Sequence, residues 1–122
     1  MAFTPVIIES IYDYQFNFKR LLKYKDTIIW RNCENLEITI KSKINKLIFE
    51  NCKNIKIIMC DAIIGVEFNK CNDIKLKIKK DKIVNSIETF LSNVELKIYK
   101  QNINFITFFT ENSKLKFISH FN

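Results

Sequence analysis

The chain has 122 residues, of which 48% are hydrophobic, a formal net charge of +7 at pH 7, and only one Gly and one Pro. This length suits one domain, and the hydrophobic content excludes a disordered chain. This scarcity of Gly and Pro excludes an ordinary β-protein with many hairpins. If the chain forms strands, we expect asparagine at the turns between them, because asparagine tolerates left-handed backbone.

The start of the chain, residues 1–10, lacks a basic region followed by a long apolar run, and no run in the sequence approaches about 18 consecutive apolar residues. These features exclude a signal peptide and a membrane span, so we expect a cytoplasmic protein whose four cysteines are reduced thiols. Aromatic and apolar residues alternate only loosely across the first segment, residues 1–26. We therefore expect this segment to form an irregular coil that caps one end of the domain.

A cysteine repeat begins after this segment, because Cys33, Cys52 and Cys71 follow one another at intervals of nineteen residues. An apolar residue stands three positions after each cysteine, and Asn or Asp stands two positions after it. The match is looser before the cysteines, where Phe49 and Phe68 stand three positions before Cys52 and Cys71 but Arg31 stands two positions before Cys33. The fourth unit aligns Leu91 with the cysteines, and the fifth keeps the register loosely with Asn112 and Leu115. A fixed period near twenty residues predicts a solenoid.

Each unit contains short segments in which apolar and polar residues alternate, such as Leu36–Ile38, Ile55–Ile57, Ile74–Leu76 and Val94–Leu96. Period-two alternation predicts strands with one buried face, and the prevalence of β-branched isoleucine disfavours helix. Stacked coils would bury these faces as a continuous core. We predict an all-β, parallel β-helix of about five to six short coils, with residues 27–100 as its main body and one domain overall.

The final segment, residues 101–122, departs from the repeat because residues 103–109 are apolar on both strand faces. We expect a C-terminal strand or hairpin that is buried on one side by a second copy of the chain. The predicted homodimer interface comprises Ile103, Phe105, Phe108, Phe109, Leu115 and Phe117.

Several motifs in the stretch from Ile40 to Tyr99 give a resemblance to a known family. Lys43–Ile48 leads to Asn51–Lys53, and Ile64–Glu67 leads to Cys71. In this order and spacing the stretch resembles the C-terminal β-helical domain of cyclase-associated proteins, within the wider group that includes tubulin-binding cofactor C. The resemblance implies a right-handed β-helix that dimerises by exchanging C-terminal strands, binds monomeric actin and promotes nucleotide exchange on it.

The sequence also departs from this family. Ser42 replaces the family glycine before Lys43, and the fourth coil lacks the usual Lys-Thr-Asp-Gly turn. The GTPase-activating arginine motif of cofactor C is missing too, because neither Arg20 nor Arg31 lies in a Gln-x-Arg-x-His-like context. We therefore exclude GTPase activation.

Catalytic, cofactor and metal chemistry finds no support in the remaining residues. The cysteines lie on successive coils without a Cys-x-x-Cys pair, so we expect stacked core thiols, with Cys60 off the file and exposed. His120 is the only histidine, and Gly65 alone cannot form a phosphate loop. We predict a protein that is not an enzyme and has no cofactor or metal.

The outward lysines are the candidate partner-binding residues: Lys56, Lys75, Lys77, Lys79, Lys80, Lys82 and Lys97. Files of lysine on a flat β-helix face suit an acidic partner, and with the resemblance they indicate monomeric actin. A nucleic acid is the second candidate, because phosphates repeat at a similar spacing, although arginines and exposed aromatics are scarce. A merely solubilising surface is the third interpretation.

Overall fold

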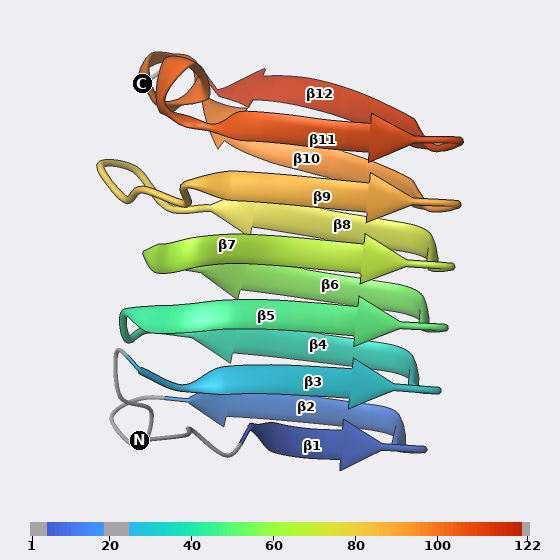
Figure 1. The fold of residues 1–122 in the computed structure, drawn as a ribbon. Helices are drawn as coiled ribbons and strands as arrows, with labels where there is room; N and C mark the ends of the chain where they lie inside the picture. The colour runs from blue at the N-terminus through green and yellow to red at the C-terminus, as the bar shows by residue number, and fades with distance from the viewer. Residues whose placement is uncertain (1–4, 19–24, 121–122) are drawn as a thin grey trace.

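The computed structural model describes residues 5–18 and 25–120, which form a solenoid of two parallel six-stranded sheets (Figure 1). Sheet A contains β1 (Val6–Glu9), β3 (Thr27–Arg31), β5 (Ile44–Glu50), β7 (Ala62–Asn69), β9 (Ser86–Phe90) and β11 (Thr107–Glu111). Sheet B contains β2 (Tyr12–Phe18), β4 (Glu34–Ile40), β6 (Lys53–Met59), β8 (Asn72–Ile78), β10 (Asn93–Tyr99) and β12 (Lys114–His120).

Each coil comprises one strand of sheet A followed by one strand of sheet B, and the described residues form six coils. The nearer strands in Figure 1 run left to right and the farther ones right to left while the chain climbs, which makes the β-helix right-handed. The predicted parallel β-helix is therefore confirmed. No helix among the described residues is long and apolar enough to cross a membrane.

The core lies between the sheets, where the alternating residues of each strand point inward. Leu36, Ile55 and Ile74 stack in register across β4, β6 and β8, and each is 0–1% exposed. Burying such a side chain stabilises the fold by roughly 1.5–3 kcal/mol, so these files are a main source of stability.

An aromatic file crosses sheet A next to these aliphatic residues. The rings of Trp30 and Phe49 stack with centroids 5.7 Å apart, and those of Phe49 and Phe68 stack at 5.2 Å. Trp30, rather than Arg31, is thus the equivalent of the two phenylalanines, so the repeat is stricter than the sequence comparison indicated. Arg31 lies on the outer face and pairs with Glu50 at 3.3 Å.

The corners between the sheets use left-handed residues in place of glycine. One such position precedes the cysteine file in every coil: Ser10, Asn32, Asn51, Lys70, Leu91 and Asn112. A second follows it in the first four coils: Asp13, Asn35, Asn54 and Asp73. Side-chain amides join successive corners, as where Asn51 Nδ2 donates to Asn32 Oδ1 at 2.7 Å. Asparagine therefore forms half of these ten turns, as predicted, and aspartate, serine, lysine and leucine form the others.

The cysteine file contributes hydrogen bonds to the same corners. Cys33, Cys52 and Cys71 are each 2% exposed, and each thiol donates to the carbonyl two residues earlier at 3.3–3.4 Å. Burial raises the pKa of the Cys33 thiol, and the neighbouring Cys71 sulfur together with burial raises the pKa of the Cys52 thiol. The Cys33 and Cys52 thiols are therefore neutral core groups at physiological pH.

Serine continues this file, which corrects the predicted register of the fourth unit. The Ser92 hydroxyl donates to the Phe90 carbonyl at 2.8 Å and accepts the Cys71 N–H at 3.0 Å. Leu91 is instead the left-handed corner residue and is 46% exposed. The prediction of an exposed Cys60 was also wrong, because this side chain is 7% exposed.

The C-terminal end of the chain differs from the sequence expectation. The C-terminal residues form a sixth coil rather than a hairpin, because β11 pairs with β9 while β12 pairs with β10 in the other sheet. The 3-10 helix η1 (Lys100–Phe105) occupies the start of the expected strand. At the other end β1 and β2 pair with β3 and β4 as a further coil, and β3 begins nine residues after β2 ends, which displaces this coil from the nineteen-residue period. Residues 1–4 and 19–24 lie outside the described part.

Candidate partner-binding surface

The outer face of sheet B brings four of the predicted lysines together. Lys56 on β6 pairs in register with Lys75 on β8, and Lys77 on β8 pairs with Lys97 on β10. Adjacent strands lie about 4.8 Å apart, so the two pairs form a compact basic block. Glu37 and Glu95 flank it, in register with Lys56 and Lys75 respectively.

The other three predicted lysines lie at the corner that follows β8. The Lys79 N–H donates to the Met59 carbonyl at 3.0 Å, and the Lys82 N–H donates to the Lys79 carbonyl at 3.2 Å. These two bonds fix a tight turn with Lys80 at its exposed tip. The corner therefore extends the basic surface beyond one edge of sheet B.

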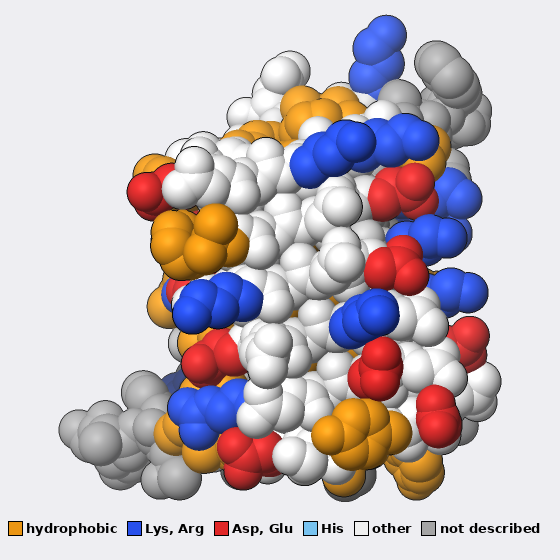
Figure 2. Space-filling model, turned by 90° about the vertical axis from the view of Figure 1, so that its right-hand side faces the viewer, with side chains coloured by type: hydrophobic (Ala, Val, Ile, Leu, Met, Phe, Trp, Pro, Cys, Tyr) orange, Lys and Arg blue, Asp and Glu red, His pale blue; other side chains and the backbone are white. Residues whose placement is uncertain are grey.

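Charge is divided unequally between the two sheets. In the last four coils the strands of sheet B carry seven lysines and two carboxylates, whereas those of sheet A carry one lysine and four glutamates. Figure 2 shows the corner between the sheets, with acidic and basic side chains alternating along the edge that leads into sheet B. A compositional excess of lysine would spread over both faces, so this distribution marks sheet B as the basic surface.

An ion-pair network on sheet A escaped the sequence analysis. Lys46 Nζ lies 3.1 Å from Glu67 Oε1 and 3.4 Å from Glu88 Oε2, so it links three coils. Burial lowers the pKa of Lys46, but the hydrogen bonds and charges of Glu67 and Glu88 outweigh this effect and raise it. The sequence did contain a signal of this network. Glu67 and Glu88 are twenty-one residues apart, close to one repeat, and they pair in register on the outer face of sheet A.

Gly65 lies next to this network and explains why glycine is used there. Its φ is +148°, and a Cβ atom would lie 2.0 Å from the Ser86 carbonyl oxygen. Only glycine allows β7 and β9 to approach so closely at this point.

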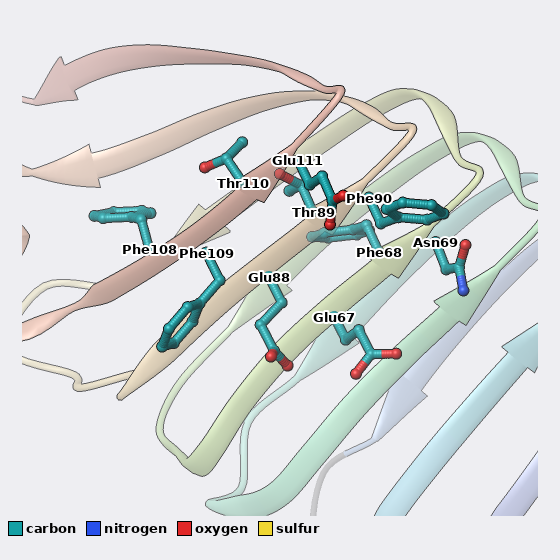
Figure 3. Close-up of a pocket in the computed structure, with 10 residues that line it drawn as sticks. All are labelled: Glu67, Phe68, Asn69, Glu88, Thr89, Phe90, Phe108, Phe109, Thr110 and Glu111. Carbon is teal, nitrogen blue, oxygen red and sulfur yellow. The ribbon is translucent and has the colours of Figure 1, made fainter.

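A shallow groove of about 620 Å³ crosses the outer face of sheet A near its C-terminal end (Figure 3). Glu67, Glu88 and Phe109 extend from the same side of β7, β9 and β11 and form one wall. The opposite wall is the neighbouring outward file, Asn69, Phe90 and Glu111. Sequence analysis missed this groove because its residues come from three coils.

The predicted dimer residues occupy three different places. Phe108, Leu115 and Phe117 point inward in the last coil, where the Phe108 and Phe117 rings meet edge to face at 5.3 Å and Phe117 remains 47% exposed. Ile103 packs against the core from η1. Phe105 and Phe109 are 63% and 56% exposed, and Phe109 belongs to the outer face of sheet A.

Comparisons with known proteins agree with this architecture. The crystal structure of cyclase-associated protein from Cryptosporidium parvum superposes with a TM-score of 0.83 at 22% sequence identity, covering 94% of this chain and 73% of that one. No curated protein matches by sequence. A sequence model of the family described as adenylate cyclase associated (CAP) C terminal matches residues 19–105, which is more than half of the chain. The chain therefore belongs to the family of C-terminal domains of cyclase-associated proteins.

Proposed function

We propose that this domain binds monomeric actin through the outer face of sheet B and promotes nucleotide exchange on it, without being an enzyme itself. Membership of the cyclase-associated protein family supports the choice of actin. The observation that carries the choice of face is the concentration of lysines on sheet B and of glutamates on sheet A in the same four coils. An acidic surface of actin is the complementary partner.

Exchange promotion requires no catalytic side chain. A protein accelerates nucleotide release when it binds the nucleotide-free or open state of actin more tightly than the closed, loaded state. A β-helix face suits this task because parallel pairing to both neighbouring strands fixes the backbone of β8 before any contact is made. Little ordering cost then opposes binding.

Release of a fluorescent nucleotide from actin monomers tests the proposal. We expect this protein to accelerate release, and the double variant K75E/K77E to weaken its effect by about tenfold or more, since two like charges would face the acidic partner. The double variant K41E/K70E changes charge equally at exposed corners and should retain activity. Unchanged release, together with a salt-dependent shift of DNA or RNA mobility, would replace actin with nucleic acid.

We further propose that the open end of the last coil pairs with a second copy of the chain. Among the described residues no further coil covers the inward side chains of Phe108, Leu115 and Phe117, and β11 and β12 pair with a described neighbour on one side only. Sedimentation velocity should detect a dimer at micromolar concentration, and F117S should shift it toward monomer. A wild-type chain that sediments as a monomer would refute this assembly.

A further inference from the structure

The groove on sheet A presents hydrogen-bond acceptors rather than donors. Glu67, Glu88 and Glu111 contribute carboxylates, and Lys46 contacts one oxygen of each of the first two. Ionised carboxylates only accept hydrogen bonds and carry negative charge, so these walls favour a ligand that brings cationic donors.

Two phenylalanines flank these acceptors. Phe90 is 37% exposed and Phe109 is 56% exposed, and they stand on opposite walls of the groove. Exposed aromatic rings of this kind supply apolar contact area and also attract cations over their faces. The ligand should therefore combine positive charge with apolar side chains.

We infer that this groove is a second interaction surface, which binds an extended polypeptide segment rich in arginine or lysine and interspersed with apolar residues. Its cations would pair with Glu88 and Glu111, and its apolar side chains would pack on Phe90 and Phe109. Charge complementarity identifies this occupant, because the groove is acidic within a chain whose net charge is +7. An acidic segment would be repelled there.

The groove and the lysine surface lie on opposite faces of the solenoid. Packed sheets are about 10 Å apart, so two partners of opposite charge can bind at the same time without touching each other. The inference does not depend on the identity of the acidic partner, and the domain would act as an adaptor between an acidic and a basic protein.

Fluorescence anisotropy with a labelled peptide of alternating arginine and leucine tests the inference. We expect salt-sensitive binding, no binding of the matching glutamate–leucine peptide, and about tenfold weaker binding by E111Q or F109S. Both positions are exposed in the last coil, so the fold should persist. The matched control E37Q makes the same charge change on sheet B and should bind the peptide as the wild type does.

Three outcomes would overturn the inference: equal loss of peptide binding in E37Q, equal binding of the acidic peptide, or no binding at all. Salt-sensitive self-association that E111Q abolishes, without peptide binding, would assign the groove to the lysine face of a second copy. The exchange assay separates this inference from the proposed function. Groove variants should accelerate nucleotide release as before, and K75E/K77E should still bind the basic peptide.

Discussion

The second to fourth coils and the last two coils share one backbone geometry but fill it with different side chains. The earlier coils stack Trp30, Phe49 and Phe68 in the core, whereas Thr89 and Thr110 continue that file in the later ones. Thiols in the earlier coils give way to serine hydroxyls. Backbone pairing and the hydrogen bonds at the corners thus maintain the shape of every coil. The larger core side chains of the earlier coils should contribute more to the free energy of unfolding than the smaller ones of the later coils.

Loss of an aromatic ring from the earlier coils should give the largest effect. Phe49 is fully buried between two stacked rings, so F49A should lower the free energy of unfolding by about 3–5 kcal/mol through lost burial and a cavity. Urea denaturation measures the change. F105A, at a 63% exposed position, is the control and should change stability by less than about 0.5 kcal/mol. Similar losses of unfolding free energy in F49A and F105A would contradict the view that the aromatic core of the earlier coils carries most of the stability.

The junction between the two regions should be nearly as sensitive. G65A would force a side chain toward the Ser86 carbonyl at a φ of +148°, so we expect a loss of about 2–4 kcal/mol. Thermal unfolding followed by circular dichroism measures it. A change within experimental error would show that β7 and β9 can separate without cost.

The serine that replaces cysteine tests the later coils. S92A removes the acceptor of the Cys71 N–H and should lower the free energy of unfolding by about 1–2 kcal/mol. S92C should recover much of this loss if thiol and hydroxyl are interchangeable in the file. Equal stability of S92A and wild type in urea would show that the corner hydrogen bond is dispensable.

The Lys46 network, which links both regions, should make stability depend on alkaline pH. The folded-state pKa of Lys46 is raised, so its contribution is fully present below the unfolded pKa of about 10.4 and is lost as pH rises through the folded value. K46M should remove this part of the pH dependence, with a loss below about 1 kcal/mol at neutral pH because the glutamates are partly exposed. Parallel pH profiles for K46M and wild type would refute the network's role.

The smallest change should come from a later-coil threonine and have the opposite sign. Thr89 is 3% exposed, and its hydroxyl has no hydrogen-bond partner among the described residues. T89V replaces that hydroxyl with a methyl group of similar size, so stability should rise by up to about 1 kcal/mol. A clear loss of stability in urea would show that the hydroxyl is satisfied in solution.

The fold followed from the sequence because its signals are local. Alternation in segments such as Ile55–Ile57 and the nineteen-residue cysteine spacing each report one strand or one coil. The predicted register of the fourth unit was wrong at Ser92 because a small polar residue gives no apolar signal. The predicted C-terminal strand was wrong at its start because η1 occupies the run that is apolar on both faces.

The candidate surfaces were predictable only in part. The pairs Lys56–Lys75 and Lys77–Lys97 could be inferred because equivalent positions of adjacent coils stack directly. The sheet A groove could not, because it depends on which side of three separate strands Glu67, Glu88 and Phe109 point toward. Acidic residues scattered along the chain become one wall only after the coils are in register.

The direction of the backbone hydrogen bonds also determines how the domain responds to mechanical tension. Both sheets pair coil to coil, so these bonds run parallel to the solenoid axis, and the first and last described strands, β1 and β12, lie at opposite ends of that axis (Figure 1). A force that pulls the ends apart loads the terminal coils first, and the bonds of one coil break before those of the next. The domain should therefore lengthen in small steps, as an extensible link rather than a rigid strut.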